Sequence, residues 1–216
     1  AAVACFLVFR LRSILGRRTG HQENTQLRDA PPSSASENDN VISLPGRRSG
    51  EPTSQQTLEA ALSKIRVADP NFTNRDFVNG AKRAFPMIVE SFASGDTASL
   101  RPLLGDDLYD DFSTAIRDRN AAGETLETEI EDISDAQIVD AELDGRKALI
   151  TVRFTSKQRN VTRNAEGEPI EGDPDAAETV TDLWTFVRNT RSKDPTWALV
   201  RTEVPSDSDD QERGNG

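Results

Sequence analysis

Residues 133–158, ISDAQIVDAELDGRKALITVRFTSKQ, contain the clearest strand pattern in the chain together with a tight turn. From Ala148 to Phe154, apolar residues alternate with more polar ones, which is the two-residue period of a half-buried strand. Asp144–Gly145 is a dipeptide typical of a two-residue hairpin loop. We therefore predict a β-hairpin in which ISDAQIVDAEL is the partner strand, and this hairpin decides the fold.

Two more strands are predicted after the hairpin. They are TVTDLWTFVRN, residues 179–189, and TWALVRTEV, residues 196–204, separated by a loop that contains Asp194–Pro195. A polar insertion, residues 164–178, lies between the second and third strands. The second half of the domain is therefore predicted to be an antiparallel sheet of about four strands.

The segment before the hairpin shows helical spacing instead. In residues 58–67, apolar residues recur at positions i, i+3, i+4 and i+7, which predicts a helix with one apolar face. In the next helix, Thr73 is the expected N-cap, and Phe72 and Phe77 occupy the two positions of a hydrophobic staple. Gly95 is expected to end that helix.

Shorter helices are predicted at residues 99–104 and 107–121. Helices followed by an antiparallel sheet are the layout of an α+β domain. Because the chain has 216 residues, one or two domains are expected.

The ends of the chain differ from this central part. Residues 19–56 are rich in Pro, Ser, Asn, Glu and Gly, and such a stretch buries too little apolar surface to offset its chain entropy. We predict a disordered tether at 19–56, an ordered domain at 57–204 and a disordered acidic tail at 205–216. Within the tether, VISLPGRR is either a docking motif or plain linker.

Residues 1–18 are interpreted as the end of a membrane anchor with its basic flank. An apolar run is followed by four arginines, and cations that follow an apolar segment are expected on the cytoplasmic side of a membrane helix. A cleaved signal peptide has the opposite order. The residues predicted to contact the membrane here are Phe6, Phe9, Arg10, Arg12, Arg17 and Arg18.

Charge and composition narrow the classes of function. The net charge is −11, although residues 1–50 hold seven arginines and four acidic residues, a net charge of +3. An acidic body argues against nucleic acid as a partner, because phosphate binding requires a basic face. The chain has one Cys and one His, so neither a His/Cys metal site nor a Cys–His nucleophile pair is expected. Phosphate-binding glycine motifs are missing, and no cofactor or catalytic residue is predicted.

Large apolar side chains provide the candidate binding residues. Core packing is the default for each of them, but a helix layer over a curved sheet can also enclose an apolar pocket. The candidates for lining a pocket or contacting a partner are Phe77, Phe85, Ile88, Phe92, Phe112, Phe154, Trp184 and Phe186.

Three motifs resemble the Tim44-like domain family: the GAK-x-AFP helix, the F-T-S-x-Q segment, and the D-x-W-T-F strand followed by DP-x-W. The resemblance covers roughly Leu58 to Val204. It implies a cone-shaped α+β domain, similar to nuclear transport factor two, with helices on a twisted antiparallel sheet. It also implies a large apolar pocket and membrane contact through the early helices, which adds Lys64 and Arg66 to the predicted membrane-contacting residues.

The leading hypothesis is a membrane-tethered, non-enzymatic scaffold with its domain on the cytoplasmic side of an inner membrane. Its expected partners are proteins at that membrane, with a link to protein translocation, and an acyl chain or apolar peptide is the expected pocket occupant. The first alternative is an enzyme or lipid-binding protein of the cone-shaped fold, and an enzyme would need an Asp or Glu pair inside an apolar cavity. A ribosome-associated receptor is a lesser alternative, weakened by the acidic body.

Overall fold

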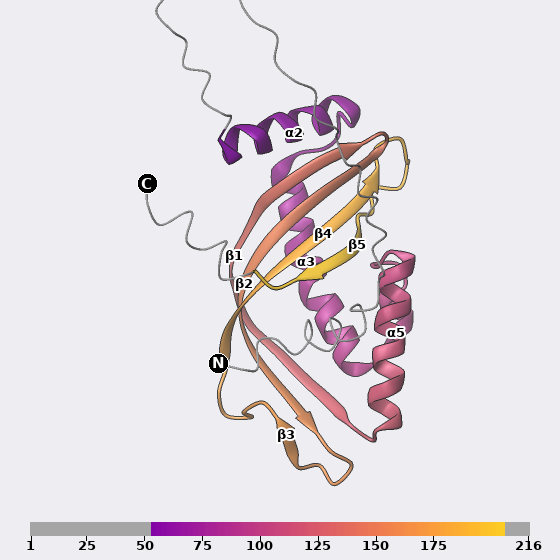
Figure 1. Cartoon of the computed structure of the whole chain (residues 1–216), viewed down its shortest axis with the longest axis vertical. Helices are drawn as coiled ribbons and strands as arrows, with labels where there is room; N and C mark the ends of the chain where they lie inside the picture. The colour runs from indigo at the N-terminus through magenta and orange to yellow at the C-terminus, as the bar shows by residue number, and fades with distance from the viewer. Residues whose placement is uncertain (1–52, 206–216) are drawn as a thin grey trace, which may run out of the picture.

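The computed structural model describes residues 53–205, and these residues form helices packed on one antiparallel sheet (Figure 1). The helices are α2 (Ser54–Ala68), α3 (Asn74–Ser94), α4 (Thr97–Leu100) and α5 (Asp106–Ala121). The strands are β1 (Thr125–Asp144), β2 (Lys147–Arg163), β3 (Pro169–Glu171), β4 (Glu178–Asn189) and β5 (Ala198–Glu203). The predicted α+β fold class is therefore confirmed. The predicted anchor, and the tether up to residue 52, lie outside the described residues, as does the tail from residue 206.

The sheet is built around the predicted hairpin. Its strand order is β1-β2-β4-β5, and the short β3 pairs with β2 within the polar insertion. Asp144 pairs with Lys147 across the turn, where Gly145 has a φ of 57°, a conformation that glycine adopts without strain. The hairpin is longer than expected, because β1 begins at Thr125.

Three register shifts interrupt the pairing of β1 with β2, after Ile130, Ile133 and Ile138. Each shift adds a residue to one strand, which bends that strand and increases its twist. The shifts also keep the apolar residues of β1 on the inner side of the sheet although these residues do not alternate strictly in sequence. Because of this irregular spacing, the first half of β1 does not show the two-residue period, and the sequence does not predict it as a strand.

The helices cover the inner face of the curved sheet. Figure 1 shows α3 running behind the strands, α2 lying across the upper end and α5 standing beside the lower half. The ring of Phe85 on α3 packs 4.6 Å from that of Phe154 on β2 and 4.5 Å from that of Trp184 on β4. These three aromatic side chains form the centre of the core.

The ends of the first two helices follow from local hydrogen bonds. Thr73 accepts a hydrogen bond from the Asp76 amide at 3.0 Å, as predicted for an N-cap, and Gly95 ends α3 with a φ of 76°. Helix α2 begins at Ser54, inside the stretch predicted as tether, because Thr53 and Gln56 form a reciprocal capping box. Residues 45–57 contain no apolar side chain of the kind that marks a helix face, so hydrophobic periodicity does not indicate where this helix begins.

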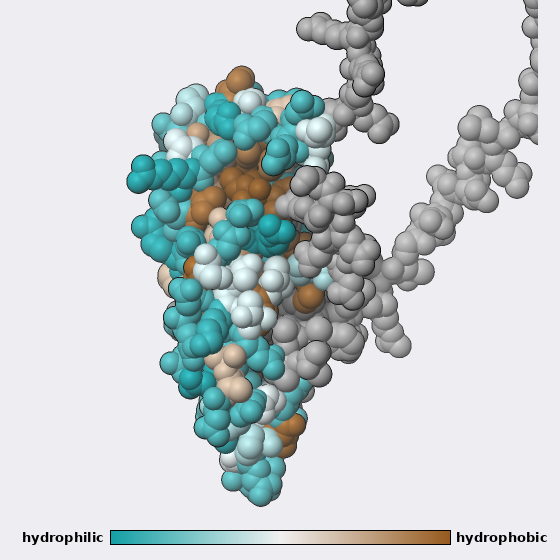
Figure 2. Space-filling view, turned by 90° about the vertical axis from the view of Figure 1, so that its left-hand side faces the viewer, coloured by the Kyte–Doolittle hydropathy of each residue, from teal (hydrophilic) through white to brown (hydrophobic). Residues whose placement is uncertain are grey.

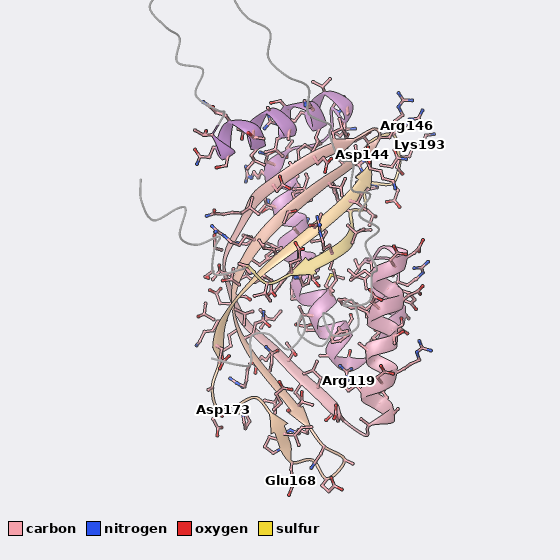
Figure 3. All side chains as sticks on the ribbon, in the orientation of Figure 1. Arg119, Asp144, Arg146, Glu168, Asp173 and Lys193 are labelled. Atoms are coloured by element: carbon pink, nitrogen blue, oxygen red, sulfur yellow. The ribbon has the colours of Figure 1, made fainter. Side chains whose placement is uncertain are left out.

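A buried arginine joins α5 to the end of α3. One amino group of Arg119 donates hydrogen bonds of 2.9 Å to the carbonyl oxygens of Phe92 and Ala93, which lie in the last turn of α3 (Figure 3). A cation at this end also interacts favourably with the helix dipole. Arg119 therefore fixes the angle between the two helices that close the lower half of the core.

A buried ion pair joins the α2–α3 turn to the end of β4. Arg188 donates to Asp69 at 2.5 Å, and the two side chains are 12% and 5% exposed. Arg188 also donates to the carbonyl oxygens of Asp194 and Ser192 in the β4–β5 loop. This single side chain therefore ties the end of β4 to the adjoining β4–β5 loop and to the α2–α3 turn, where Asp69 lies 119 positions away in the sequence.

A second buried carboxyl group lies on the inner face of β4. Asp182 pairs in register with Phe154 and is 7% exposed. Burial raises the pKa of Asp182 to about 7, although a hydrogen bond with Gln158 acts in the opposite direction. The protonated form of this residue is therefore the one that the folded core favours.

We predict that Arg188→Met destabilises the full chain by about 3–5 kcal/mol, because it leaves the Asp69 carboxylate buried without its partner. The double variant Asp69→Leu with Arg188→Met should recover more than half of that loss, since it removes both charges. Urea unfolding measures both values. Arg66→Met, which removes an exposed ion pair with Glu59, is the control and should cost much less. An equal loss in Arg66→Met and Arg188→Met would contradict the assigned role.

The buried Asp182 predicts a specific pH dependence. Its pKa is about 7 when folded and near the usual 3.8 when unfolded, so the folded state binds more protons between these values. The free energy of unfolding should therefore fall as pH rises from 4 to 7, by up to about 1.4 kcal/mol per pH unit from this residue.

Asp182→Asn should remove that contribution. The stability difference between the variant and the wild type should grow from pH 5 to 7 and level off above pH 7, in urea unfolding at each pH. Asp140→Asn, at an exposed position of β1, is the control for replacing a surface carboxylate. A difference between Asp182→Asn and wild type that stays constant with pH would show that Asp182 is ionised in the folded protein throughout.

Candidate functional site: a groove beside α3

A groove of about 820 Å³ lies between the N-terminal half of α3 and the β4–β5 loop. Its apolar lining residues are Phe72, Phe77, Gly80, Ala81, Ala84, Leu103, Phe186, Pro195 and Trp197, and its polar ones are Asn71, Thr73, Asp76, Arg83, Arg188, Ser192, Lys193 and Thr196. Several of the polar residues are exposed, so the groove opens to solvent on that side. The volume is within the range of sites that hold a small molecule or part of a peptide.

The apolar wall of the groove is a cluster of four aromatic side chains. The Phe77 ring lies 4.8 Å from the Trp197 ring and 5.9 Å from the Phe186 ring, both in edge-on geometry. Phe72 lies 6.0 Å from Phe77, as the predicted staple requires, and 5.9 Å from Trp197. The capped start of α3 and the β4–β5 loop thus build the wall together.

The ion pair described above fixes both sides of this groove. Asp69 precedes the segment that carries Phe72, while Arg188 binds the loop that carries Ser192 and Lys193. The positive charge of Arg188 is therefore already engaged within the protein. Its role at the groove is to position the wall.

The rim carries two further cations. Within residues 53–205, neither Arg83 nor Lys193 has a hydrogen bond or ion pair, and both are exposed. Figure 3 shows Lys193 at the upper end of the sheet, near the hairpin turn that carries Asp144 and Arg146. The carboxylate of Asp76 accepts a 2.7 Å hydrogen bond from the Thr73 hydroxyl. The groove therefore has a net positive rim in a chain whose net charge is −11.

The structure separates the predicted pocket residues into two sets. Phe77 and Phe186 line the groove. The other six are enclosed in the core and line none of the described pockets: Phe85, Ile88, Phe92, Phe112, Phe154 and Trp184. The groove is also lined by three residues that the sequence prediction does not include: Phe72, Gly80 and Trp197. Phe72 belongs to the hydrophobic staple and Trp197 to the DP-x-W motif, so the sequence does mark both positions.

The predicted membrane-contacting residues are only partly described. Lys64 and Arg66 are exposed on α2, and Arg66 pairs with Glu59 at 3.2 Å. Lys64 borders a shallow apolar hollow with Val67, which is 85% exposed, and Leu143. The six candidates between Phe6 and Arg18 lie outside the described residues. The helices of residues 53–205 are all too short or too polar to cross a bilayer.

Apolar surface also appears on the β1 side of the molecule. Half-buried apolar side chains occur on α2 and along the inner side of β1, including Leu58, Ile133 and Ile138. Figure 2, which views the side that is on the left in Figure 1, shows apolar surface gathered in the upper half of this face within a polar surround. On this face, the apolar surface therefore lies toward the α2 end of the domain.

The charged side chains that line the groove are mostly cationic. Asp76 is the one carboxylate among its lining residues, and Asp182, with its raised pKa, is not among them. Two titratable groups with different environments, which an acid–base mechanism needs, are not brought together there. Within residues 53–205, no group of His, Cys, Asp and Glu is arranged to hold a metal ion.

Comparisons with known proteins agree with this architecture. A probable mitochondrial import inner membrane translocase subunit, tin-44 of Caenorhabditis elegans, is 24% identical over 69% of this chain and 36% of its own length. The human mitochondrial import inner membrane translocase subunit TIM44 is 23% identical over 73% of this chain and 35% of its own length. The chain therefore spans about a third of the length of these relatives.

Among solved structures, the intermembrane-space region of the chloroplast protein ARC6 has a TM-score of 0.43 at 11% identity, covering 60% of this chain and 96% of that one. This likeness is too weak to carry an argument. The decisive match is to a family description, the Tim44-like domain, over residues 58–204. That match covers the described helices and sheet almost completely, and the chain belongs to the Tim44-like domain family.

Proposed function

We propose that this chain is a non-enzymatic scaffold, tethered to an inner membrane, whose groove beside α3 binds protein partners in connection with protein translocation. The observation that carries the proposal is the groove itself, with an aromatic wall and two cations that have no partner within the described residues. Family membership supplies the context, because both curated relatives are named as subunits of an import translocase.

The chemistry of the groove favours recognition of a partner over turnover of a substrate. A partly accessible aromatic side chain supplies a large contact area with little loss of conformational freedom, and Trp and Arg are enriched among the residues that dominate binding energies. The proposed anchor is Trp197, the half-buried member of the aromatic wall, which packs on the buried rings of Phe72 and Phe77, each 6% exposed. The positive charges of Arg83 and Lys193 would orient the partner and increase its association rate.

The N-terminal part of the chain would place the groove near the membrane. The apolar run up to Phe9 would be the end of the anchor, and Arg10 to Arg18 would lie on the cytoplasmic side. A flexible chain of the length of residues 19–52, as proposed for the tether, would have an average end-to-end distance of about 30–35 Å. Confinement within this distance raises the effective concentration of the domain for partners at the same membrane.

An acyl chain is the second candidate occupant of the groove. The apolar wall and the cationic rim are compatible with a lipid whose headgroup is anionic. A lipid would make the domain a lipid-binding module of the same membrane, so the experiment below is designed to separate the two occupants.

We predict that a photo-crosslinking amino acid at Thr196, on the exposed rim, captures a membrane-protein partner or a translocating chain in native membranes. The full-length protein is used, and products are identified by mass spectrometry. The matched control carries the same amino acid at Glu168, an exposed position at the opposite end of the domain (Figure 3). Protein adducts from Thr196 alone are expected, and they should be components or substrates of a protein translocase.

Two results would count against the proposal. Adducts of equal yield and identity from Thr196 and Glu168 would show that the groove has no special role. Recovery of the protein in the soluble fraction, without any membrane-protein adduct, would remove the tethered scaffold as its function.

A further inference from the structure

Gly80 lies in the middle of the wall that α3 contributes to the groove, and nothing within the domain requires a glycine there. A Cβ atom placed on Gly80 meets no other atom within 4 Å, and the residue lies in the regular helical span Asn74–Ser94. Glycine inside a helix is less stable than alanine. Gly80 therefore lowers the stability of α3, and the packing of the described residues does not explain why a glycine stands there.

Glycine does allow another molecule to approach the helix backbone closely. Ala84, one helical turn later, lines the same groove, so the α3 surface between the aromatic wall and the rim is formed by small side chains. The distance between two packed helices depends on the side chains at their contact, and small residues permit the closest approach. This surface suits a second helix better than a single extended side chain.

The positive charges at the rim indicate that the occupant carries a negative charge. Arg83 lies three residues after Gly80 on the same helix, and Lys193 lies on the facing β4–β5 loop. Neither has a hydrogen bond or ion pair within residues 53–205, whereas Arg188 is engaged with Asp69. Two such cations beside an apolar surface complement a ligand that is apolar on one side and carries a carboxylate.

We propose that the groove holds a short amphipathic helix of a protein partner, with its backbone close to Gly80 and an acidic side chain against Arg83 and Lys193. This inference rests on the proposed function and specifies the chemistry of the partner. Thr196, on the exposed rim, suits the polar edge of a peptide, whereas the Thr73 hydroxyl is already engaged with Asp76.

The test compares variants of the full-length chain that carry the photo-crosslinking amino acid at Thr196 in native membranes. Gly80→Ala fills the open space and should raise the unfolding midpoint in urea, because it improves helix propensity. The same variant should lower the yield of the protein adduct at least about fivefold, equivalent to about 1 kcal/mol of binding. If the fold itself required a glycine at this position, Gly80→Ala would instead lower both the unfolding midpoint and the adduct yield.

A neighbouring residue supplies the matched control. Asn79 is exposed on the same helix and does not line the groove, so Asn79→Ala should raise helix propensity without changing the adduct yield. The double variant Arg83→Gln with Lys193→Gln should reduce the yield about as strongly as Gly80→Ala. Added salt should weaken capture by the wild type more than capture by this double variant.

The sequence of the captured fragment provides the second readout. We expect a segment with helical spacing of apolar residues, at least one Gly, Ala or Ser on that face, and an Asp or Glu beside it. Unchanged capture of a translocase component by Gly80→Ala would overturn the inference and leave the proposed function standing. A lipid adduct in place of a peptide would overturn it in favour of a lipid occupant. A lack of any adduct specific to Thr196 would remove the proposed function as well.

Discussion

The Asp69–Arg188 ion pair is the constraint on which the upper half of this domain depends. It lies where the α2–α3 turn, the end of β4 and the β4–β5 loop meet, and it is almost completely excluded from water. The aromatic wall consists of residues from the same segments, so its geometry is set by this contact. A buried pair of this kind is a weak source of net stability, but it specifies one arrangement, because any other leaves a charge buried without its partner.

The lower half of the domain is held by different means. There Arg119 takes the place of the ion pair, by donating to the last carbonyl groups of α3, and the sheet narrows toward the short β3 pairing. The two halves share the aromatic centre formed by Phe85, Phe154 and Trp184. The groove thus lies where the Asp69–Arg188 ion pair, the backbone hydrogen bonds of Leu199 with Leu103 and Gly105, and aromatic side chains join the helical part to the sheet.

Local patterns in the sequence predict most of the helices and strands, but not β3, the first half of β1 or the first turn of α2. The alternation from Ala148 to Phe154, the Asp144–Gly145 turn and the Thr73 cap each depend on neighbouring residues, and each appears in the structure as expected. Binding residues are harder to predict, because the sequence shows that a phenylalanine is buried but not which cavity it borders. Phe85 and Phe77 have the same helical spacing, yet one is enclosed in the core and the other lines the groove. The pairing of Asp69 with Arg188 joins residues 119 positions apart, and no local pattern indicates it.

The irregular pairing of β1 has a consequence for self-association of the chain at high concentration. β1 is a 20-residue strand at one end of the described sheet, and a long straight edge of this kind is a template for pairing with another chain. Its three register shifts break that edge into short pieces, and the carboxylates of Glu127 and Glu129 are engaged in ion pairs with Arg163 and Arg159 of β2. A second copy of the chain therefore meets an interrupted, twisted edge, which disfavours edge-to-edge pairing and would keep each domain a separate unit.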